Sequence, residues 1–242
     1  MWFNDIDPTK MHPAISIMHE IAPGSAKRRI DTLKGTDGEI VTGVTMEAGE
    51  YTVRMNIAGR TRNEAWDVRE KIAAWAASSG EQLAKLIPTH KPDRYYNAIL
   101  SSISDPKFTR GFATVDVVFL VPRPVALSMQ QSYAGGMGGM QARIGGSHPA
   151  RPVLKQTIAS GRNGVTWTMN GKTILTMIGE FAAGDEIEMD TLRESLTVNG
   201  AYAMHRLDPQ RTKWRPGYKP GMHTIASTDG GRMEMRWRDE WQ

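Results

Sequence analysis

The residues best suited to chemistry gather in one short acidic stretch, namely Asp185, Glu186, Glu188 and Asp190. If the stretch is a strand, Glu186 and Glu188 share one face about 7 Å apart. Such a pair could act as the two carboxylates of a glycosidase, and with Asp190 it could bind calcium. However, no glycine-turned calcium loop surrounds them, and apolar Ile187 and Met189 alternate with them. The pattern therefore favours the solvated face of a half-buried strand.

The sequence contains few residues arranged for nucleophilic catalysis or metal binding. Its six histidines are scattered without the close spacing that metal ligands on one element need, at His12, His19, His90, His148, His205 and His223. We interpret them as surface or turn residues. The absence of cysteine excludes disulfides, cysteine-bound metal and thiol nucleophiles, and no Gly-x-Ser-x-Gly elbow occurs. These residues therefore give no positive support for a catalytic residue, a metal ligand or a cofactor.

Two glycine motifs invite a phosphate-binding interpretation. Residues 171–173 read Gly-Lys-Thr, but the spacing of a phosphate-binding loop requires glycine at position 166, which is Thr166. The glycine-rich run at 133–146 is not followed by Lys-Ser or Lys-Thr in register. A hairpin turn and a linker are therefore favoured over a nucleotide site.

Aromatic and basic residues offer two binding hypotheses in the C-terminal half. The stretch from Arg206 to Lys219 mixes five basic residues with Trp214, which would suit nucleic acid, but its prolines favour an exposed or protein-contacting loop. Trp214 and Trp241 could also stack on sugar rings. Trp167 and Trp237 lie on the apolar side of alternating segments, so we expect them in the core.

The elements that position these residues are mostly strands. Residues 51–58 alternate apolar and polar, and 113–121 become apolar on both sides, which predicts a strand buried on both faces. A single long helix is predicted over about 62–79, because apolar residues recur every three or four positions between Thr61 and Gly80. Four dipeptides predict turns between neighbouring strands, namely Asn170-Gly171, Asn199-Gly200, Asp37-Gly38 and Asp229-Gly230.

Composition agrees with a folded protein of ordinary surface charge. The chain has 242 residues, 40% of them hydrophobic, and a net charge of +4, which is not a nucleic-acid-binding signature. No apolar run approaches the roughly 20 residues of a membrane helix, and no signal peptide is visible. The Pro-Arg-Pro at 122–124 and the glycine run that follows predict three parts: a domain at 1–124, a Gly/Met-rich linker at 125–147, and a second domain at 148–242.

Short motifs follow one another in a characteristic order along both halves. In the first half they are Arg28-Arg29, 33–38, the strand at Tyr51, the helix end at 72–75, 93–98 and 112–124. In the second half they are 184–190, 198–200, Trp214 and 218–225. This order resembles that of the distal tail protein (Dit) family of bacteriophages with long, non-contractile tails, and the resemblance covers most of the chain.

The resemblance implies a mainly β fold with two β-sandwich-type domains, the N-terminal one with a single long helix and the C-terminal one galectin-like or jelly-roll-like. It implies a structural virion protein, with no active site, made in the host cytoplasm and placed at the distal end of the tail. Its implied partners are itself in a hexameric ring, the tail tube protein, and tail-tip or tail-associated lysin and receptor-binding proteins. Genome DNA would pass through the ring without sequence-specific binding, and no membrane is involved.

Two further points concern how such a hub would act. The polar, glycine-rich segment from Asp31 to Thr45 could supply an arm for contacts between subunits. The alternative function is a carbohydrate-binding β-sandwich that assists attachment to the host surface, with Trp214 and Trp241 as the stacking residues.

Overall fold

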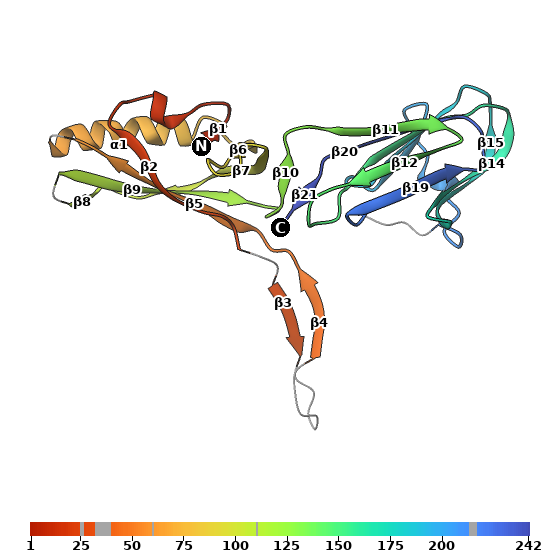
Figure 1. Cartoon of the computed structure of the whole chain (residues 1–242), viewed down its shortest axis with the longest axis horizontal. Helices are drawn as coiled ribbons and strands as arrows, with labels where there is room; N and C mark the ends of the chain where they lie inside the picture. The colour runs from red at the N-terminus through yellow and green to blue at the C-terminus, as the bar shows by residue number, and fades with distance from the viewer. Residues whose placement is uncertain (25–26, 32–39, 60, 110, 213–216) are drawn as a thin grey trace. The chain divides into compact units, whose positions relative to one another are not determined.

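The computed structural model describes the chain except residues 25–26, 32–39, 60, 110 and 213–216. It divides into two compact units, Met1–Ala126 with Gln242, and Leu127–Trp241 (Figure 1). The first contains, in chain order, β1 (Trp2–Phe3), a 3-10 turn (Pro8–Lys10), β2 (Ile15–Ile21), β3 (Lys27–Asp31), β4 (Ile40–Thr45), β5 (Gly49–Ile57), α1 (Arg62–Ala76), β6 (Ala84–Ile87), β7 (Arg94–Ile103), β8 (Lys107–Thr109) and β9 (Phe112–Val121).

The first unit is built on an antiparallel sheet in the order β1-β6-β7-β9-β5-β2, with β8 paired to β9. Strands β3 and β4 form a separate two-stranded sheet. The predicted alternation holds in β5, where Tyr51, Val53, Met55 and Ile57 are all fully buried. Among the described strands β2 pairs with β5 alone, and its register shifts between Ile17 and His19. It is therefore an edge strand interrupted by a bulge.

Helix α1 lies against one face of this sheet (Figure 1). It begins where predicted, because the Thr61 hydroxyl accepts a hydrogen bond from the Glu64 amide at 3.2 Å and so caps the first turn. It ends at Ala76, three residues before the predicted end. The Trp75 ring packs edge-on against Phe3 and Phe119, with centroids 6.0 and 5.8 Å apart. The helix thus buries the stripe that its sequence predicts.

The other face of the sheet is only partly covered, which corrects the expectation that β9 is buried on both faces. Val115, Val117 and Phe119 are buried beneath α1, whereas Leu120 is 36% exposed on the opposite face. Asp116 on that face pairs with Arg54 through two hydrogen bonds of 2.7 and 2.9 Å. The apolar residues at the end of this face predicted burial, but Leu120 is exposed there.

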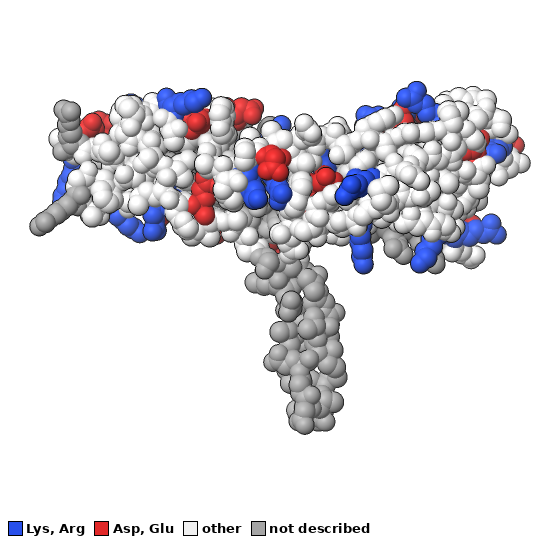
Figure 2. Space-filling model, in the orientation of Figure 1, with Lys and Arg blue, Asp and Glu red and all other residues white. Residues whose placement is uncertain are grey.

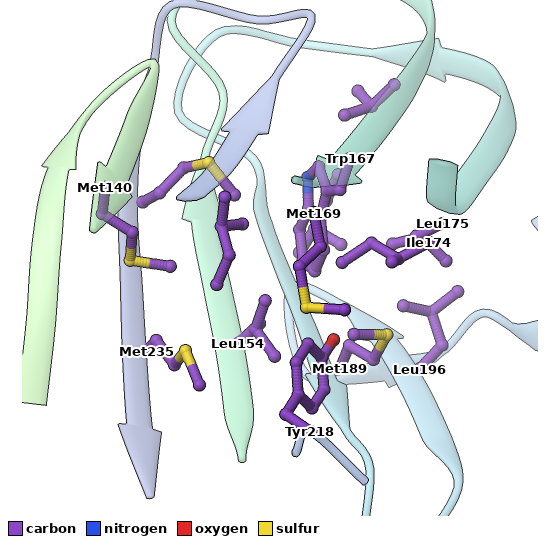
Figure 3. Packing of buried hydrophobic residues seen from close by; sticks show 14 of the residues in the cluster. Met140, Leu154, Trp167, Met169, Ile174, Leu175, Met189, Leu196, Tyr218 and Met235 are labelled. Carbon is purple, nitrogen blue, oxygen red and sulfur yellow. The ribbon is translucent and has the colours of Figure 1, made fainter. Parts of the chain in front are cut away.

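The second unit is a sandwich of two antiparallel sheets. Its elements are β10 (Ala126–Ser128), β11 (Ser132–Met137), β12 (Gly139–Ile144), β13 (Val153–Thr157), β14 (Arg162–Met169), β15 (Lys172–Phe181), β16 (Glu186–Asp190), β17 (Ser195–Val198), β18 (Ala201–Tyr202), a 3-10 turn (Met204–Arg206), β19 (Gly221–Ser227), β20 (Arg232–Trp237) and β21 (Glu240–Trp241). One sheet runs β11-β20-β13-β16-β17-β18 and the other β12-β19-β14-β15. Their inner faces share one core, in which Met140, Leu154, Trp167 and Met235 meet (Figure 3).

The residues assigned to a linker, 125–147, form strands instead. They contain β10, β11 and β12, and β11 and β12 are edge strands of the two sheets of the sandwich. The glycines there serve close backbone approach: a Cβ on Gly136 would lie 2.2 Å from the Gly139 carbonyl oxygen, and one on Gly146 would lie 2.0 Å from that of Glu240. Composition alone suggested flexibility, but the glycines are required by tight packing.

Two of the predicted turns join paired strands. Asn170-Gly171 connects β14 to β15 and Asn199-Gly200 connects β17 to β18, and all four residues have positive φ. Asp229-Gly230 does not join neighbours, because β19 and β20 belong to different sheets, so this turn is a crossover between them. Asp37-Gly38 lies outside the described residues.

Candidate interaction surfaces

Three of the four tryptophans of the second half lie in the described part of the chain. Trp167 and Trp237 are 0% and 5% exposed, so both lie in the core as expected. Trp241, in β21, is half-buried. Trp214 lies outside the described residues, and the two-tryptophan sugar platform therefore stays a prediction.

The acidic stretch is occupied by local contacts. The Asp185 carboxylate accepts hydrogen bonds from the Asn199 side chain at 2.9 Å and from the Ala182 amide at 2.8 Å, and the Asn199 bond is the main reason why its pKa lies below the ordinary value. Glu186 pairs with Lys155 at 2.9 Å. These carboxylates therefore hold a turn and a strand pair.

The rest of that stretch is a solvated strand face. Asp190 accepts the amides of Leu192 and Arg193 at 2.8 and 3.0 Å. Ile187 and Met189 point into the core, so Glu186 and Glu188 lie on the outer face of β16. No group of three or more potential metal ligands occurs among the described residues. The glycosidase and calcium hypotheses gain no support from this geometry.

The basic stretch beginning at Arg206 contacts protein in its described part. The Arg206 guanidinium lies 3.9 Å from the centroid of the Phe181 ring and donates to the carbonyls of Ile178, at 3.3 Å, and Glu180. Arg211 pairs with Asp208. Arg206 thus fixes the start of the loop to β15, whereas Arg211 pairs within the loop. Residues 213–216 lie outside the described part.

One histidine is not at the surface. His223, in β19, is 8% exposed, which corrects the expectation that all six are surface or turn residues. Its Nε2 lies 2.7 Å from the Lys219 carbonyl oxygen and its Nδ1 lies 3.4 Å from the Asn170 amide nitrogen. Because a carbonyl only accepts, Nε2 carries the proton. The ring therefore holds residue 219 close to the β14–β15 turn.

A pocket of about 270 Å³ lies beside His223. Three separate segments line it: Pro149, residues 169–174 around the β14–β15 turn, and residues 217–223. No local motif could have revealed it, since the segments are brought together only by the sheet.

In the first unit, Glu20 is the centre of a polar cluster beside the edge strand β2. Its carboxylate is 6% exposed and accepts hydrogen bonds from the Tyr51 hydroxyl at 2.7 Å and the Thr89 hydroxyl at 2.5 Å. The Met1 ammonium donates to Thr89. Burial raises the pKa of Glu20, but the hydrogen bonds from Thr89 and Tyr51 outweigh it and the pKa is lowered overall. The cluster ties β2 to β5 and to the segment after β6.

Apolar side chains are exposed along the same edge. Met18, at the bulge of β2, is 55% exposed, and Ile21 is 53% exposed. An edge strand presents unpaired backbone groups and is a natural site for association. In the described part of the chain, α1 is too short and too polar to be a transmembrane helix.

Comparison with known proteins gives one family and several solved structures. Residues 145–241 match the family described as "Siphovirus-type tail component, C-terminal domain". No curated protein sequence matches the chain. The chain is similar to the crystal structure of the Dit protein (gp 19.1) of phage SPP1, which is described as a paradigm of the hub adsorption apparatus in phages infecting Gram-positive bacteria. The TM-score is 0.78 and the sequence identity is 14%, and the match covers 99% of this chain and 98% of that one.

Two structures of the phage P2 baseplate in its activated conformation are more distant. The one with Ca has a TM-score of 0.43 and the one with Sr 0.42. In each, identity is 10%, and 93% of this chain and 90% of that chain are covered.

Proposed function

We propose that this chain is a distal tail hub of a long-tailed bacteriophage, because residues 145–241 match the siphovirus-type tail component family and the whole chain has the fold of SPP1 Dit. The resemblance found in the sequence is thereby confirmed, as is the mainly β fold. One observation carries the proposal: the likeness to SPP1 Dit extends over 99% of this chain, both units included. The function then resides in surfaces rather than in an active site.

We propose that the hub is a homohexameric ring at the distal end of the tail, formed through the first unit. The exposed apolar side chains of the β2 edge, Met18 and Ile21, support contacts between copies, because a ring needs a heterologous interface that closes on rotation. The tail tube protein would bind one side, and tail-tip or lysin and receptor-binding proteins the other. DNA would pass through the ring without sequence-specific binding. The protein would be made in the host cytoplasm.

The test is the mass of the purified full chain by mass photometry, with electron microscopy of the particles. Hexamers and rings are expected. Ile21→Lys should abolish them, because a charge on an edge strand opposes pairing, whereas Leu192→Lys, equally exposed in the second unit, should not. A monomer at all concentrations, with no ring in tail particles, would overturn the proposal.

The carbohydrate-binding alternative depends on Trp214 and Trp241. The half-buried Trp241 leaves part of its ring accessible, so a glycan array with the wild type and Trp241→Ala tests it directly. Binding that falls in the variant supports this alternative, and silence of the wild type removes it.

A further inference from the structure

The pocket beside His223 has an apolar interior. Met169, Ile174, Tyr218 and Pro149 line it, and Figure 3 shows the first three close together. The polar side chains of Asn170 and His223 are engaged within the protein. The Asn170 side-chain oxygen accepts a hydrogen bond from the Thr224 amide at 2.8 Å, and the His223 ring nitrogens face the Lys219 carbonyl and the Asn170 amide. The interior therefore suits an apolar group.

The rim of the pocket is cationic. Lys172 and Lys219 line it and are exposed. In the described part of the chain neither ammonium group has a carboxylate within ion-pair distance, and no acidic residue lines the pocket. Two uncompensated positive charges at the rim of an apolar pocket favour an apolar group that carries anions beside it.

The neighbouring surface continues this pattern. Arg143 in β12 lies opposite Met222 in β19, which is 59% exposed, and no described carboxylate pairs with Arg143. Further along the same face, Gln141 is paired with Thr224, and Figure 2 shows few charged atoms over β12 and β19. The outer face of the other sheet, by contrast, carries ion pairs such as Arg232 with Glu234. Depletion of charge, with exposed Met and Arg, is typical of protein interfaces.

We propose that this end of the second unit docks a protein segment in which one apolar side chain is flanked by carboxylates. The apolar side chain enters the pocket, and the carboxylates pair with Lys172 and Lys219. A pocket of about 270 Å³ is below the usual range for whole small-molecule ligands, roughly 300–1,000 Å³, and suits a single side chain. The proposal stands whether or not the chain forms a ring.

The test uses the full chain labelled with ¹³C at the methionine methyl groups and followed by NMR. The probe is the blocked peptide acetyl-Asp-Leu-Asp-amide. The Met169 signal is expected to shift and saturate, while that of Met137, exposed on β11, stays in place. Lys172→Gln with Lys219→Gln should weaken binding roughly tenfold. Lys155→Gln, which removes an ion pair on the other sheet, should leave it unchanged.

Three outcomes overturn the proposal. They are an unmoved Met169 signal at saturating peptide, equal binding of acetyl-Asn-Leu-Asn-amide, and binding of free 4-phenylbutyrate without binding of the peptide. The third would assign the pocket to a small amphiphile. Lys172 and Lys219 are exposed and Lys155 is partly exposed, so folding of the variants can be verified by the unchanged core methionine signals.

Discussion

The indole N–H of Trp167 in β14 donates a hydrogen bond to the side-chain oxygen of Gln156 in β13, so a polar contact joins the two sheets inside the core of the second unit. Both residues are 0% exposed. The same oxygen accepts from the Ser227 hydroxyl at 2.9 Å, and the Gln156 amide nitrogen lies 3.2 Å from the Asp229 carboxylate. A buried polar network of this kind favours one packing of the two sheets.

Trp167→Phe removes the donor of this bond and leaves a gap in the core. We expect a loss of about 3 kcal/mol in the free energy of unfolding, from the weakened hydrogen bonding of Gln156 and from the lost ring volume. Urea unfolding followed by circular dichroism measures it. Trp66→Phe on α1, where the ring is 41% exposed, is the control and should change stability by less than about 0.5 kcal/mol. Equal effects of the two substitutions would contradict a structural role for the Trp167 bond.

Asp229 holds the crossover between β19 and β20. One of its carboxylate oxygens accepts the amides of Ala159 at 2.8 Å and Gly231 at 2.9 Å, and the other lies 3.3 Å from Arg162. In Asp229→Asn the side-chain NH₂ group faces hydrogen-bond donors in either orientation: the Ala159 and Gly231 amides on one side, or Arg162 on the other. We expect a loss of about 2–4 kcal/mol, measured by urea unfolding. A similar loss is expected in Arg162→Met, which leaves the buried carboxylate without its cationic partner. A neutral Asp229→Asn would show that the carboxylate is not needed.

Local pattern predicted much of the fold, and it failed where partners are distant in sequence. The alternation of Val165, Trp167 and Met169 correctly predicted a strand with these side chains inside. Nothing local identified Gln156 as buried, because Trp167 and Ser227 lie on other strands. The pocket at Lys172 and Lys219 was missed for the same reason.

Glycine content misled in a different way. It does not distinguish a flexible tether from a close backbone approach, and Gly136 shows the second case: a Cβ there would lie 2.2 Å from the Gly139 carbonyl oxygen. We expect Gly136→Ala to cost about 2 kcal/mol or more, since backbone must move. Gly230→Ala is the matched control, because its Cβ would meet nothing within 4 Å. Thermal unfolding compares the two, and equal melting temperatures would restore the linker interpretation.

The cap of α1 can be tested with two substitutions at one position. Thr61 accepts the Glu64 amide through its hydroxyl, so Thr61→Ala should lower the free energy of unfolding by about 1 kcal/mol. Thr61→Ser keeps the acceptor and should retain most of that stability. Urea unfolding monitored at 222 nm measures both. If serine and alanine are equally destabilising, the methyl group of Thr61 rather than its hydroxyl stabilises the start of α1.

Acidification should weaken the first unit through Glu20. Its pKa in the folded state is lowered below the ordinary 4.5, because the hydrogen bonds from Thr89 and Tyr51 outweigh burial. A carboxylate with a lowered pKa stabilises the fold fully above its unfolded pKa, and this stabilisation disappears as the pH falls through the folded pKa. Glu20→Gln removes the titrating group. The wild type should therefore be the more stable form at pH 7, and the difference in the free energy of unfolding should shrink between about pH 5 and pH 3.

Urea unfolding of both proteins across this pH range measures the difference. Glu50→Gln, which changes an exposed carboxylate on β5, is the control. A difference that stays constant with pH would mean that Glu20 contributes by shape rather than by charge.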